Sequence, residues 1–448
     1  MSIIFYHVFL WAYRMGIGAI APWNRKARSW LEGRKGLFER IQAELSAAAG
    51  RAGPETGRTT GSQAAEMTGK YPVIWMHCSS LGEFEQGRPV LERLRAASPA
   101  CKVIISFFSP SGFEARKDYE GADHVFYLPL DSKKNARRFI DLIRPDLVIW
   151  IKYDYWYYFL VELKKRRIPT LLVSGIFRPD QPFFKWWGRL HRYMLECFTH
   201  LFVQTDGSRQ LLETIGFGGN VSISGDTRFD RVIEIAEDRE SLPVIEAFCR
   251  GCRVIVAGST WEEDEEELDH YANTHPELRF IIAPHDIDED RIKEVEKLFR
   301  HRIRYSELVT SYRPLAAGGS RPVPNVLIID NIGMLSRLYQ YATITYVGGG
   351  FGDDGVHNVL EAAVYGRPVV FGPVIEKYIE AVELTECGGG IVIDSALEAE
   401  SVFNRLLNNE EELRQASEAS RNYVYARKGA TDLILNYIIS SGWLVGKM

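Results

Sequence analysis

Glu83 is the residue of this sequence best placed for acid–base chemistry. It stands in the segment 77–84, HCSSLGEF, directly after the apolar run 73–77. A carboxylate in a strand-to-helix turn lies where ligands bind to parallel sheets, and the helix N-terminus behind it can orient it. Glu83 is therefore a candidate general base. The alternative is a first-turn glutamate that only satisfies helix N–H groups, and spacing alone leaves both roles open.

A glycine-rich segment at 348–361, GGGFGDDGVHNVLE, suggests a phosphate or sugar ligand. It matches GxGxxG, but it lies late in its half of the chain, which disfavours a dinucleotide site. Gly350 and Gly352 are expected to expose backbone N–H groups, with a helix N-terminus following them. Asn358 and Glu361 lie three residues apart on one helical face, available to a sugar or base edge. Plain turn chemistry is the alternative.

Hydroxyl and acidic side chains follow two further apolar runs. Ser259 and Thr260 come after Gly258, where they serve either as helix caps or as phosphate ligands. The acidic run 262–267 behind them is predicted to be a solvated helix face. The segment 286–290, DIDED, has the spacing of a metal-binding motif, but an acidic helix start explains it as well. We expect no metal site.

Short apolar runs alternate with helix-length segments, and these elements must position the residues above. The first series comprises the runs 73–77, 102–108, 124–128, 146–151, 169–174, 200–205 and 221–225. The second comprises 253–259, 279–285, 325–330, 343–350, 367–372 and 389–393. Strands separated by helices form parallel sheets with both faces covered. The sequence therefore predicts an α/β protein with two Rossmann-like halves, whose ligands bind at the carboxyl ends of the strands.

These patterns divide the chain into six segments. We expect a membrane-anchor and basic helical segment at 1–47, a flexible linker or loop at 48–70, an N-terminal Rossmann-like domain at 71–230, an interdomain linker at 231–252, a C-terminal Rossmann-like domain at 253–425 and a C-terminal helix at 426–448.

The segment 3–21, IIFYHVFLWAYRMGIGAIA, is apolar apart from His7 and Arg14. Because Arg14 interrupts it, a membrane-spanning helix is marginal, and neither a basic n-region nor a cleavage site supports a signal peptide. Seven Lys and Arg between residues 14 and 40, against two Glu, favour attachment to an anionic membrane surface. A helix packed on its own domain is the alternative.

Charge and cysteine content exclude several classes of protein. The 448 residues carry 54 Lys and Arg against 59 Asp and Glu, a net charge of −5, so no global basic field points to nucleic acid. Six cysteines in so long a chain indicate a reducing compartment, and the lone CxxC at 249–252 is better explained by core thiols than by zinc. No P-loop, HExxH, GxSxG or kinase signature occurs.

Taken in order, the motifs resemble those of the Kdo transferases of lipopolysaccharide synthesis, which move 3-deoxy-D-manno-octulosonic acid (Kdo) from CMP-Kdo to a lipid A precursor. The resemblance runs through HCSSLGEFEQGRPVLERL at 77–94, SGDTRFD at 224–230, AGSTWEE at 257–263 and GGGFGDDGVHNVLEAAVYGRPVVFGP at 348–373. It implies the GT-B fold, two Rossmann-like domains facing across a cleft, with an N-terminal membrane-associated helix. It further implies inverting, metal-independent transfer without a cofactor to lipid IVA, at the cytoplasmic face of the inner membrane and without nucleic acid.

The resemblance also assigns roles to single residues. The family's base matches Glu83, Arg228 keeps the charge of a family lysine, and Lys152 replaces a glutamate thought to assist the transition state. The implied donor-binding residues are Ser259, Thr260, Pro284, His285, Ile332, Gly333, Met334, Gly350, Gly352, Asn358, Val359, Leu360 and Glu361. The usual PRH reads APH at 283–285, and the usual MGE reads IGM at 332–334, so one arginine and one carboxylate are lost.

Charge on the leaving phosphate is expected to be stabilised by the helix N-termini after Gly258 and Gly352, together with Arg228 or Lys152. A basic, aromatic stretch at 177–193 is expected to contact phosphorylated lipid, unless its cations only snorkel from an ordinary helix. Two other functions stay open: another GT-B enzyme that uses a UDP- or GDP-sugar with a lipid acceptor, and a membrane-tethered scaffold with an inactive GT-B fold.

Overall fold

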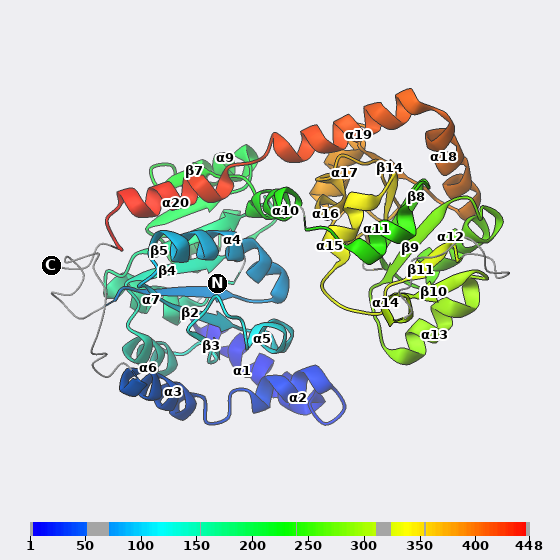
Figure 1. Cartoon of the computed structure of the whole chain (residues 1–448). Helices are drawn as coiled ribbons and strands as arrows, with labels where there is room; N and C mark the ends of the chain where they lie inside the picture. Colours follow the sequence, from blue (N-terminus) through cyan, green and yellow to red (C-terminus); the bar gives the residue numbers. More distant parts are fainter. Residues whose placement is uncertain are drawn as a thin grey trace, which may run out of the picture. The chain divides into compact units, whose positions relative to one another are not determined.

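The computed structural model describes residues 3–51, 71–152, 154–238, 240–310, 324–353 and 355–444. The chain forms two α/β units, of which the first comprises Met1–Arg228 with Gly429–Met448 and the second Phe229–Lys428. In each unit, helices cover both faces of a seven-stranded parallel sheet (Figure 1). The alternating apolar runs predicted this arrangement.

The first sheet has the strand order β3-β2-β1-β4-β5-β6-β7. Its strands are β1 (Val73–Cys78), β2 (Lys102–Phe107), β3 (His124–Tyr127), β4 (Leu147–Ile151), β5 (Thr170–Gly175), β6 (His200–Val203) and β7 (Val221–Ile223). The helices of this unit are α1 (Ile3–Ile20), α2 (Arg25–Glu32), α3 (Leu37–Arg51), α4 (Leu81–Ala97), α5 (Pro110–Arg116), α6 (Lys133–Ile143), α7 (Tyr157–Lys165), η1 (Pro182–Phe184), α8 (Arg189–Leu195), α9 (Asp206–Thr214) and α20 (Ala430–Ser440).

Alternate residues of the central strands pack into two separate cores, one on each face of the first sheet. On β1, Trp75 belongs to one core and Ile74 and Met76 to the other. On β4, Trp150 and Ile149 are divided in the same way. Because both faces are covered, these strands are apolar throughout, which explains why continuous apolar runs mark them in the sequence.

The second sheet has the strand order β10-β11-β9-β8-β12-β13-β14. Its strands are β8 (Val254–Thr260), β9 (Arg279–Pro284), β10 (Arg302–Arg304), β11 (Val326–Ile328), β12 (Ile344–Val347), β13 (Val369–Phe371) and β14 (Gly390–Val392). The remaining helices are α10 (Thr227–Glu237), α11 (Pro243–Cys249), α12 (Glu262–Thr274), α13 (Glu289–Leu298), α14 (Tyr305–Thr310), α15 (Leu335–Leu338), η2 (Tyr339–Tyr341), α16 (Leu360–Ala363), α17 (Ile379–Glu386), α18 (Ala396–Asn408) and α19 (Glu410–Tyr425). The three-residue edge strand β10 was not predicted.

The structure differs from the predicted segments at 231–252. Residues 231–252, predicted as an interdomain linker, form most of α10 and α11 and belong to the second unit, where Ile245 and Phe248 are buried in the core. The C-terminal segment returns to the first unit as α20, which packs against α4 (Figure 1). Of the predicted linker at 48–70, the first residues continue α3 to Arg51, and 52–70 lie outside the described residues.

Helix α1 is held on the first unit by one side only. Tyr6 and Leu10 are buried, whereas Phe5, Phe9 and Trp11 are exposed. The Tyr6 hydroxyl donates to Oδ2 of Asp131 at 2.6 Å. The same carboxylate accepts the N–H groups of Tyr158 at 2.9 Å and Phe159 at 3.2 Å, where α7 begins. Asp131 therefore caps α7 and ties α1 to it.

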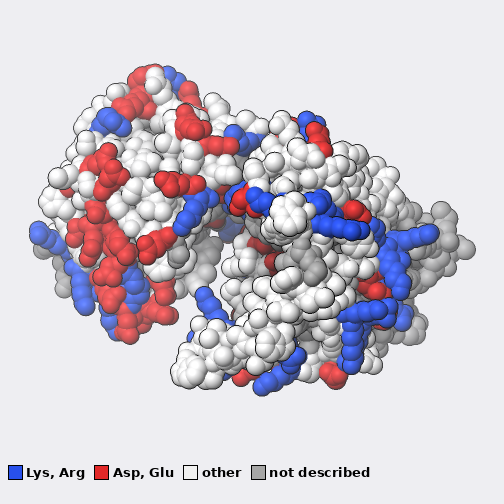
Figure 2. Space-filling view, turned by 180° about the vertical axis from the view of Figure 1, so that it is seen from behind, with Lys and Arg blue, Asp and Glu red and all other residues white. Residues whose placement is uncertain are grey.

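The two units carry net charges of opposite sign, which the near-neutral total of the chain does not reveal. The first unit contains 33 Lys and Arg against 23 Asp and Glu, a net charge of +10, and the second contains 21 against 36, a net charge of −15. Figure 2 shows dense red carboxylates on one unit and more blue cations on the other. An anionic partner therefore meets a favourable field only at the first unit.

Asp131 gives a testable pH dependence. Burial raises the pKa of its carboxyl from 3.8 to about 6, so the folded protein binds this proton more tightly than the unfolded chain. Stability from this group is present below about pH 4 and falls as the pH rises to about 6, by roughly 2–3 kcal/mol. We expect Asp131→Asn to lack this component in urea unfolding between pH 4 and 7. Parallel profiles for wild type and variant would contradict the prediction.

Candidate functional site

Glu83 lies in the first turn of α4, at the carboxyl end of β1. The Ser80 hydroxyl accepts the N–H of Glu83 at 3.4 Å, and the Glu83 carboxylate accepts the N–H of Ser79 in return. Only 8% of Glu83 is exposed. The capping role that the spacing left open is therefore real. The same contacts fix the carboxylate at the edge of the sheet, as a general base requires.

A buried aspartate organises the cations of this edge. Oδ2 of Asp226 accepts Nε of Arg228 at 2.9 Å and Nη2 at 2.7 Å, while Oδ1 accepts the N–H of Arg228 at 2.9 Å. Nε2 of Gln86, one turn beyond Glu83 on α4, donates to both oxygens at 3.3 and 3.2 Å. Burial alone would raise the pKa of Asp226, but Arg228 and Lys152 hold it below its ordinary value. Asp226 thereby holds the Arg228 guanidinium against α4.

Lys152 directly follows β4 and has a left-handed backbone, with φ of +54°. Its N–H donates to the carbonyl of Val173 at 3.1 Å, which extends the pairing with β5 by one residue. A left-handed conformation costs energy in a residue other than glycine, and such strain gathers at functional sites. Glu83, Lys152 and Arg228, which the family resemblance named as catalytic, thus lie at the carboxyl edge of one sheet. Gln86 and Asp226 were missed, although each stands in a motif that marked this edge.

Asp264 holds the glycine-rich segment of the second unit. Its Oδ2 accepts the N–H groups of Gly349 at 2.8 Å and Trp261 at 2.9 Å, and its Oδ1 accepts the Tyr346 hydroxyl at 2.6 Å. Asp264 and Glu265 are both buried. The prediction of a solvated face for 262–267 is therefore wrong at these two positions, which face the sheet.

Ser259 and Thr260 end strand β8 at an irregularity in its pairing with β9. Ser259 has a left-handed backbone, with φ of +53°. The Thr260 hydroxyl donates to Oε1 of Glu265 at 2.7 Å, and Arg291 binds the same carboxylate. Burial raises the pKa of Glu265 to about 7, although both contacts act against that rise. The Thr260 hydroxyl is thus used in a hydrogen bond within the protein. Of the two residues, Ser259 is the one that stays a candidate for ligand binding.

Three rings stack at the carboxyl ends of β8 and β9. The His285 ring lies 4.6 Å from Trp261 and 4.5 Å from His357, between centroids, and Nε1 of Trp261 donates to Nε2 of His357 at 2.8 Å. Pro284, the neighbour of His285, is the last residue of β9. Flat rings at this edge suit stacking with a heterocyclic base. Sequence analysis named His285 but missed Trp261 and His357.

Asn358 and Glu361 are brought together as predicted, because Nδ2 of Asn358 donates to Oε1 of Glu361 at 2.9 Å. The side chains of Val359 and Leu360 between them are buried. However, α16 begins only at Leu360 and is four residues long. Helix α12 begins with Glu262, Glu263, Asp264 and Glu265, which repel an anion. The predicted phosphate binding at these two helix N-termini is therefore not supported.

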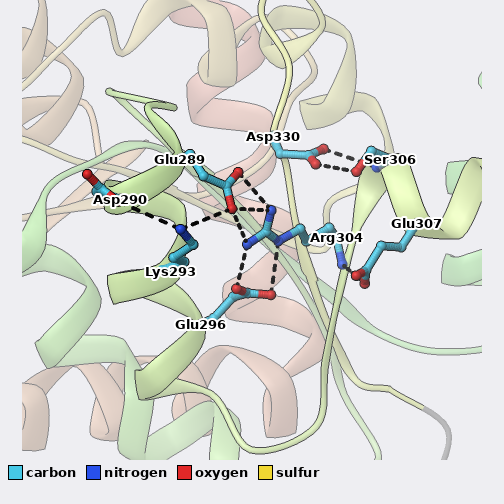
Figure 3. A network of polar contacts seen from close by, with 8 residues as sticks. All are labelled: Glu289, Asp290, Lys293, Glu296, Arg304, Ser306, Glu307 and Asp330. Carbon is cyan, nitrogen blue, oxygen red and sulfur yellow. Dashed lines mark hydrogen bonds and ion pairs between the residues drawn. The ribbon is translucent and has the colours of Figure 1, made fainter.

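A polar network fixes the loop that carries Ile332, Gly333 and Met334 beyond β11. Oδ1 of Asp330 accepts the N–H of Ser306 at 3.0 Å, and the Ser306 hydroxyl donates to the same carboxylate (Figure 3). Gly333 has φ of +96°, and Ile332 beside it is 86% exposed. Met334 is buried. Of the three residues, Ile332 is thus the most open to a ligand.

The acidic segment 286–290 takes part in ion pairs. Nη1 of Arg304 donates to Oε2 of Glu289 at 3.1 Å, and Nη2 donates to Oε2 of Glu296 at 2.7 Å (Figure 3). Lys293 also approaches Glu289. Within the described ranges, no group of three or more His, Cys, Asp or Glu side chains is arranged to hold a metal ion.

Comparisons with known proteins find similarity to 3-deoxy-D-manno-octulosonic acid transferases. The profile of a family described as "3-Deoxy-D-manno-octulosonic-acid transferase (kdotransferase)" matches residues 50–231. A 3-deoxy-D-manno-octulosonic acid transferase of Chlamydia trachomatis serovar A is 27% identical over 376 residues, 81% of this chain and 84% of that protein. A bifunctional glycosyltransferase/methyltransferase of Fusobacterium nucleatum subsp. nucleatum is 26% identical over 381 residues, 82% of this chain. The match spans 58% of that longer protein.

Solved structures share the two-unit fold at low sequence identity. A UDP-GlcNAc 2-epimerase from Neisseria meningitidis, bound to UDP-GlcNAc, superposes with a TM-score of 0.57 and 17% identity. The match covers 82% of this chain and 100% of that one. At this identity the likeness establishes the fold alone.

Two glycines of the 348–361 segment allow a matched test. A Cβ at Gly350 would lie 2.6 Å from the backbone nitrogen of Gly372, whereas a Cβ at Gly352 would approach no atom closer than the Gly349 carbonyl oxygen at 3.6 Å. We expect Gly350→Ala to lower the free energy of unfolding by about 1–3 kcal/mol, and Gly352→Ala to change it by less than about 0.5 kcal/mol. Urea unfolding of both variants checks this. Equal effects would show that backbone packing does not explain Gly350.

Proposed function

We propose that the chain is a 3-deoxy-D-manno-octulosonic acid transferase, which moves Kdo from CMP-Kdo to a lipid A precursor, lipid IVA. The family profile, relatives at about 25% identity over about 80% of the chain, and the two-domain GT-B fold support this proposal. The acceptor and the inverting course of the reaction are part of the proposal.

The observation that carries the proposal is the position of Glu83. Its carboxylate is fixed between α4 and the end of β1, with Lys152 and the Asp226–Arg228 pair at the same sheet edge. All of these residues lie within the segment 50–231 that the family profile matches. A fixed carboxylate beside cations suits a reaction that removes a proton and releases a phosphate.

The proposed reaction is one displacement at the anomeric carbon of Kdo. Glu83 accepts the proton of an acceptor hydroxyl while that oxygen forms the new bond to the anomeric carbon. The bond from this carbon to the CMP phosphate oxygen breaks, and its electron pair leaves with CMP. Attack and departure on opposite faces invert the configuration.

Negative charge that grows on the departing phosphate requires nearby cations. Arg228 and Lys152 supply them in this proposal, and the helix N-termini after Gly258 and Gly352 do not. The family resemblance implies transfer without a metal ion or cofactor, and the proposal keeps that feature. The His285 stack, Ser259 and the Asn358–Glu361 pair are proposed to bind the CMP moiety.

Substitution of the proposed base tests the function. We expect Glu83→Gln to lower the turnover of CMP-Kdo with lipid IVA by roughly 10²–10⁴-fold, since the amide accepts no proton. Glu85→Gln is the matched control, because Glu85 lies on the same helix and pairs with Arg88 and Arg116. Release of CMP and the mass of the lipid product are measured. Near-wild-type transfer by Glu83→Gln would overturn the base assignment.

The nucleotide identifies the donor in the same assay. Transfer by the wild-type enzyme from a UDP- or GDP-sugar, without transfer from CMP-Kdo, would replace the proposed donor. Absence of nucleotide release from all three donors in the presence of lipid acceptors would favour the inactive scaffold.

We also propose that α1 attaches the enzyme to the cytoplasmic face of the inner membrane. Among the described helices, α1 is long and apolar enough to cross a membrane by length and composition. Its contacts to Asp131 and Tyr158 favour a helix that lies on the surface instead, with its exposed apolar side chains inserted in the lipid. The positive charge of the first unit suits an anionic leaflet.

Vesicle binding tests this attachment. We expect the double variant Phe5→Asp/Trp11→Asp to bind anionic vesicles at least about tenfold more weakly, because each substitution removes an exposed apolar side chain from the lipid. Leu397→Asp is the control, since Leu397 is also an exposed apolar residue but lies on the second unit. Co-sedimentation with vesicles measures binding, and an equal loss for the control would contradict the role of α1.

A further inference from the structure

Arg34 is set apart from the other basic residues near the N-terminus. The sequence placed it in one basic cluster with Arg25, Lys26, Arg28 and Lys35, which are exposed. Arg34 instead turns inward, and its guanidinium carbon lies 3.9 Å from the ring centroid of Trp30, 4.9 Å from Phe108 and 5.1 Å from Tyr127. We call these four residues the Arg34 cluster.

The guanidinium of Arg34 is held by carbonyl oxygens only. Nε donates to Leu128 at 3.0 Å, Nη1 to Trp30 at 3.1 Å and Nη2 to Phe108 at 2.7 Å. No carboxylate pairs with Arg34 among the residues that the structure describes. Burial lowers the pKa of Arg34 to about 9. A desolvated cation without a counter-ion is costly, so the arrangement calls for an anion.

Two N–H groups of Arg34 remain beyond those that the three carbonyls bind. A guanidinium has five N–H donors in a planar fork, and the three carbonyls take one from each nitrogen. The remaining donors belong to Nη1 and Nη2. Two such neighbouring donors match the two oxygens of a phosphate or carboxylate.

Backbone contacts connect the Arg34 cluster to the candidate base. The N–H of Phe108, whose carbonyl holds Arg34, donates to Cys78 at 3.3 Å, and the N–H of Ser109 donates to Ser79 at 2.8 Å. Ser79 in turn donates its N–H to Glu83. Arg34 and Glu83 are thus joined to the same turn after β1.

Helix α1 forms one wall of the Arg34 cluster. The Tyr13 ring lies 5.8 Å from Trp30 and 6.0 Å from Phe108. The charges of Arg34 and Asp154 both act on the Tyr13 hydroxyl. The opposite side of α1 carries the exposed apolar residues. The helix proposed to contact lipid therefore also contacts the Arg34 cluster directly.

We propose that Arg34 binds a phosphate monoester on the head group of the lipid acceptor, and so places an acceptor hydroxyl at Glu83. This subsite rests on the proposed function, since it concerns the acceptor of that reaction. The buried aromatic rings of the Arg34 cluster keep water away from the guanidinium and so strengthen the ion pair. The carboxylate of Kdo is the other oxyanion of the reaction, and the experiment distinguishes the two.

The test compares Arg34→Gln and Arg34→Lys with Lys35→Gln, which removes an exposed charge from the neighbouring position. Transfer from CMP-Kdo is measured in detergent micelles with lipid IVA and with the same lipid after phosphatase treatment. We expect Arg34→Gln to raise the KM for lipid IVA roughly 10- to 100-fold, with little change for the dephosphorylated lipid or for CMP-Kdo. Arg34→Lys keeps the charge but loses the paired N–H donors of the guanidinium. We therefore expect its KM for lipid IVA to lie between those of wild type and Arg34→Gln.

Several results would overturn the proposal. An equal rise in KM for both lipids, together with a lower Tm, would show that Arg34 only stabilises the packing of α2 on the sheet. A raised KM for CMP-Kdo alone would assign the oxyanion to the Kdo carboxylate. A wild-type KM for lipid IVA in both Arg34 variants would exclude any role in acceptor binding.

A binding measurement separates this proposal from the reaction itself. Co-sedimentation of wild type and Arg34→Gln is compared on vesicles that contain lipid IVA and on vesicles that contain the phosphatase-treated lipid. We expect wild type to prefer the phosphorylated lipid and Arg34→Gln to lose that preference. If wild type shows this preference but transfers no Kdo, the proposed function is rejected and the phosphate subsite is kept. Equal partitioning of the two proteins would reject the subsite.

Discussion

The parallel arrangement of the strands is the constraint on which the candidate residues of both units depend. A parallel strand can return to the sheet only through a crossover connection, so every strand ends at the same edge. Glu83 and Lys152 follow β1 and β4 at this edge of the first sheet, and Arg228 follows β7. In the second sheet, Ser259 lies at the end of β8, while His285 and the 348–361 segment follow β9 and β12. Residues far apart in the chain are therefore gathered without a single long loop having to fold over them.

Buried aspartates hold these edges in shape. Asp131, Asp226 and Asp264 each accept backbone N–H groups and one or more side-chain donors. A carboxylate buried in this manner is satisfied on several sides, which fixes the segments that donate to it. Asp226 orients a cation, Asp264 orients the glycine-rich segment, and Asp131 joins the N-terminal helix to α7. The same kind of contact thus occurs beside the proposed base, at the glycine-rich segment and where α1 meets α7.

Much of the fold follows from the sequence because strands buried on both faces are apolar at every position. Trp75 and Ile74 point to opposite cores, yet both are apolar, and the run containing them was recognised as a strand. Short elements gave no such signal: β10 has three residues, and α16 has four where a full helix was expected. The segment 231–252 was misjudged because polar residues surround Ile245 and Phe248. Asp264 and Asp226 could not be identified as buried, since a charged residue reveals its burial only when its partners are known.

The division of charge between the units has a consequence for orientation. An anionic surface attracts the unit with net charge +10 and repels the unit with net charge −15. The energy therefore depends on which unit approaches the surface first, and not only on the distance of approach. This bias acts over about one Debye length, about 10 Å at 0.1 M salt, and weakens as the ionic strength rises. Electrostatic attraction thus orients the first unit toward an anionic surface before any apolar side chain contacts that surface.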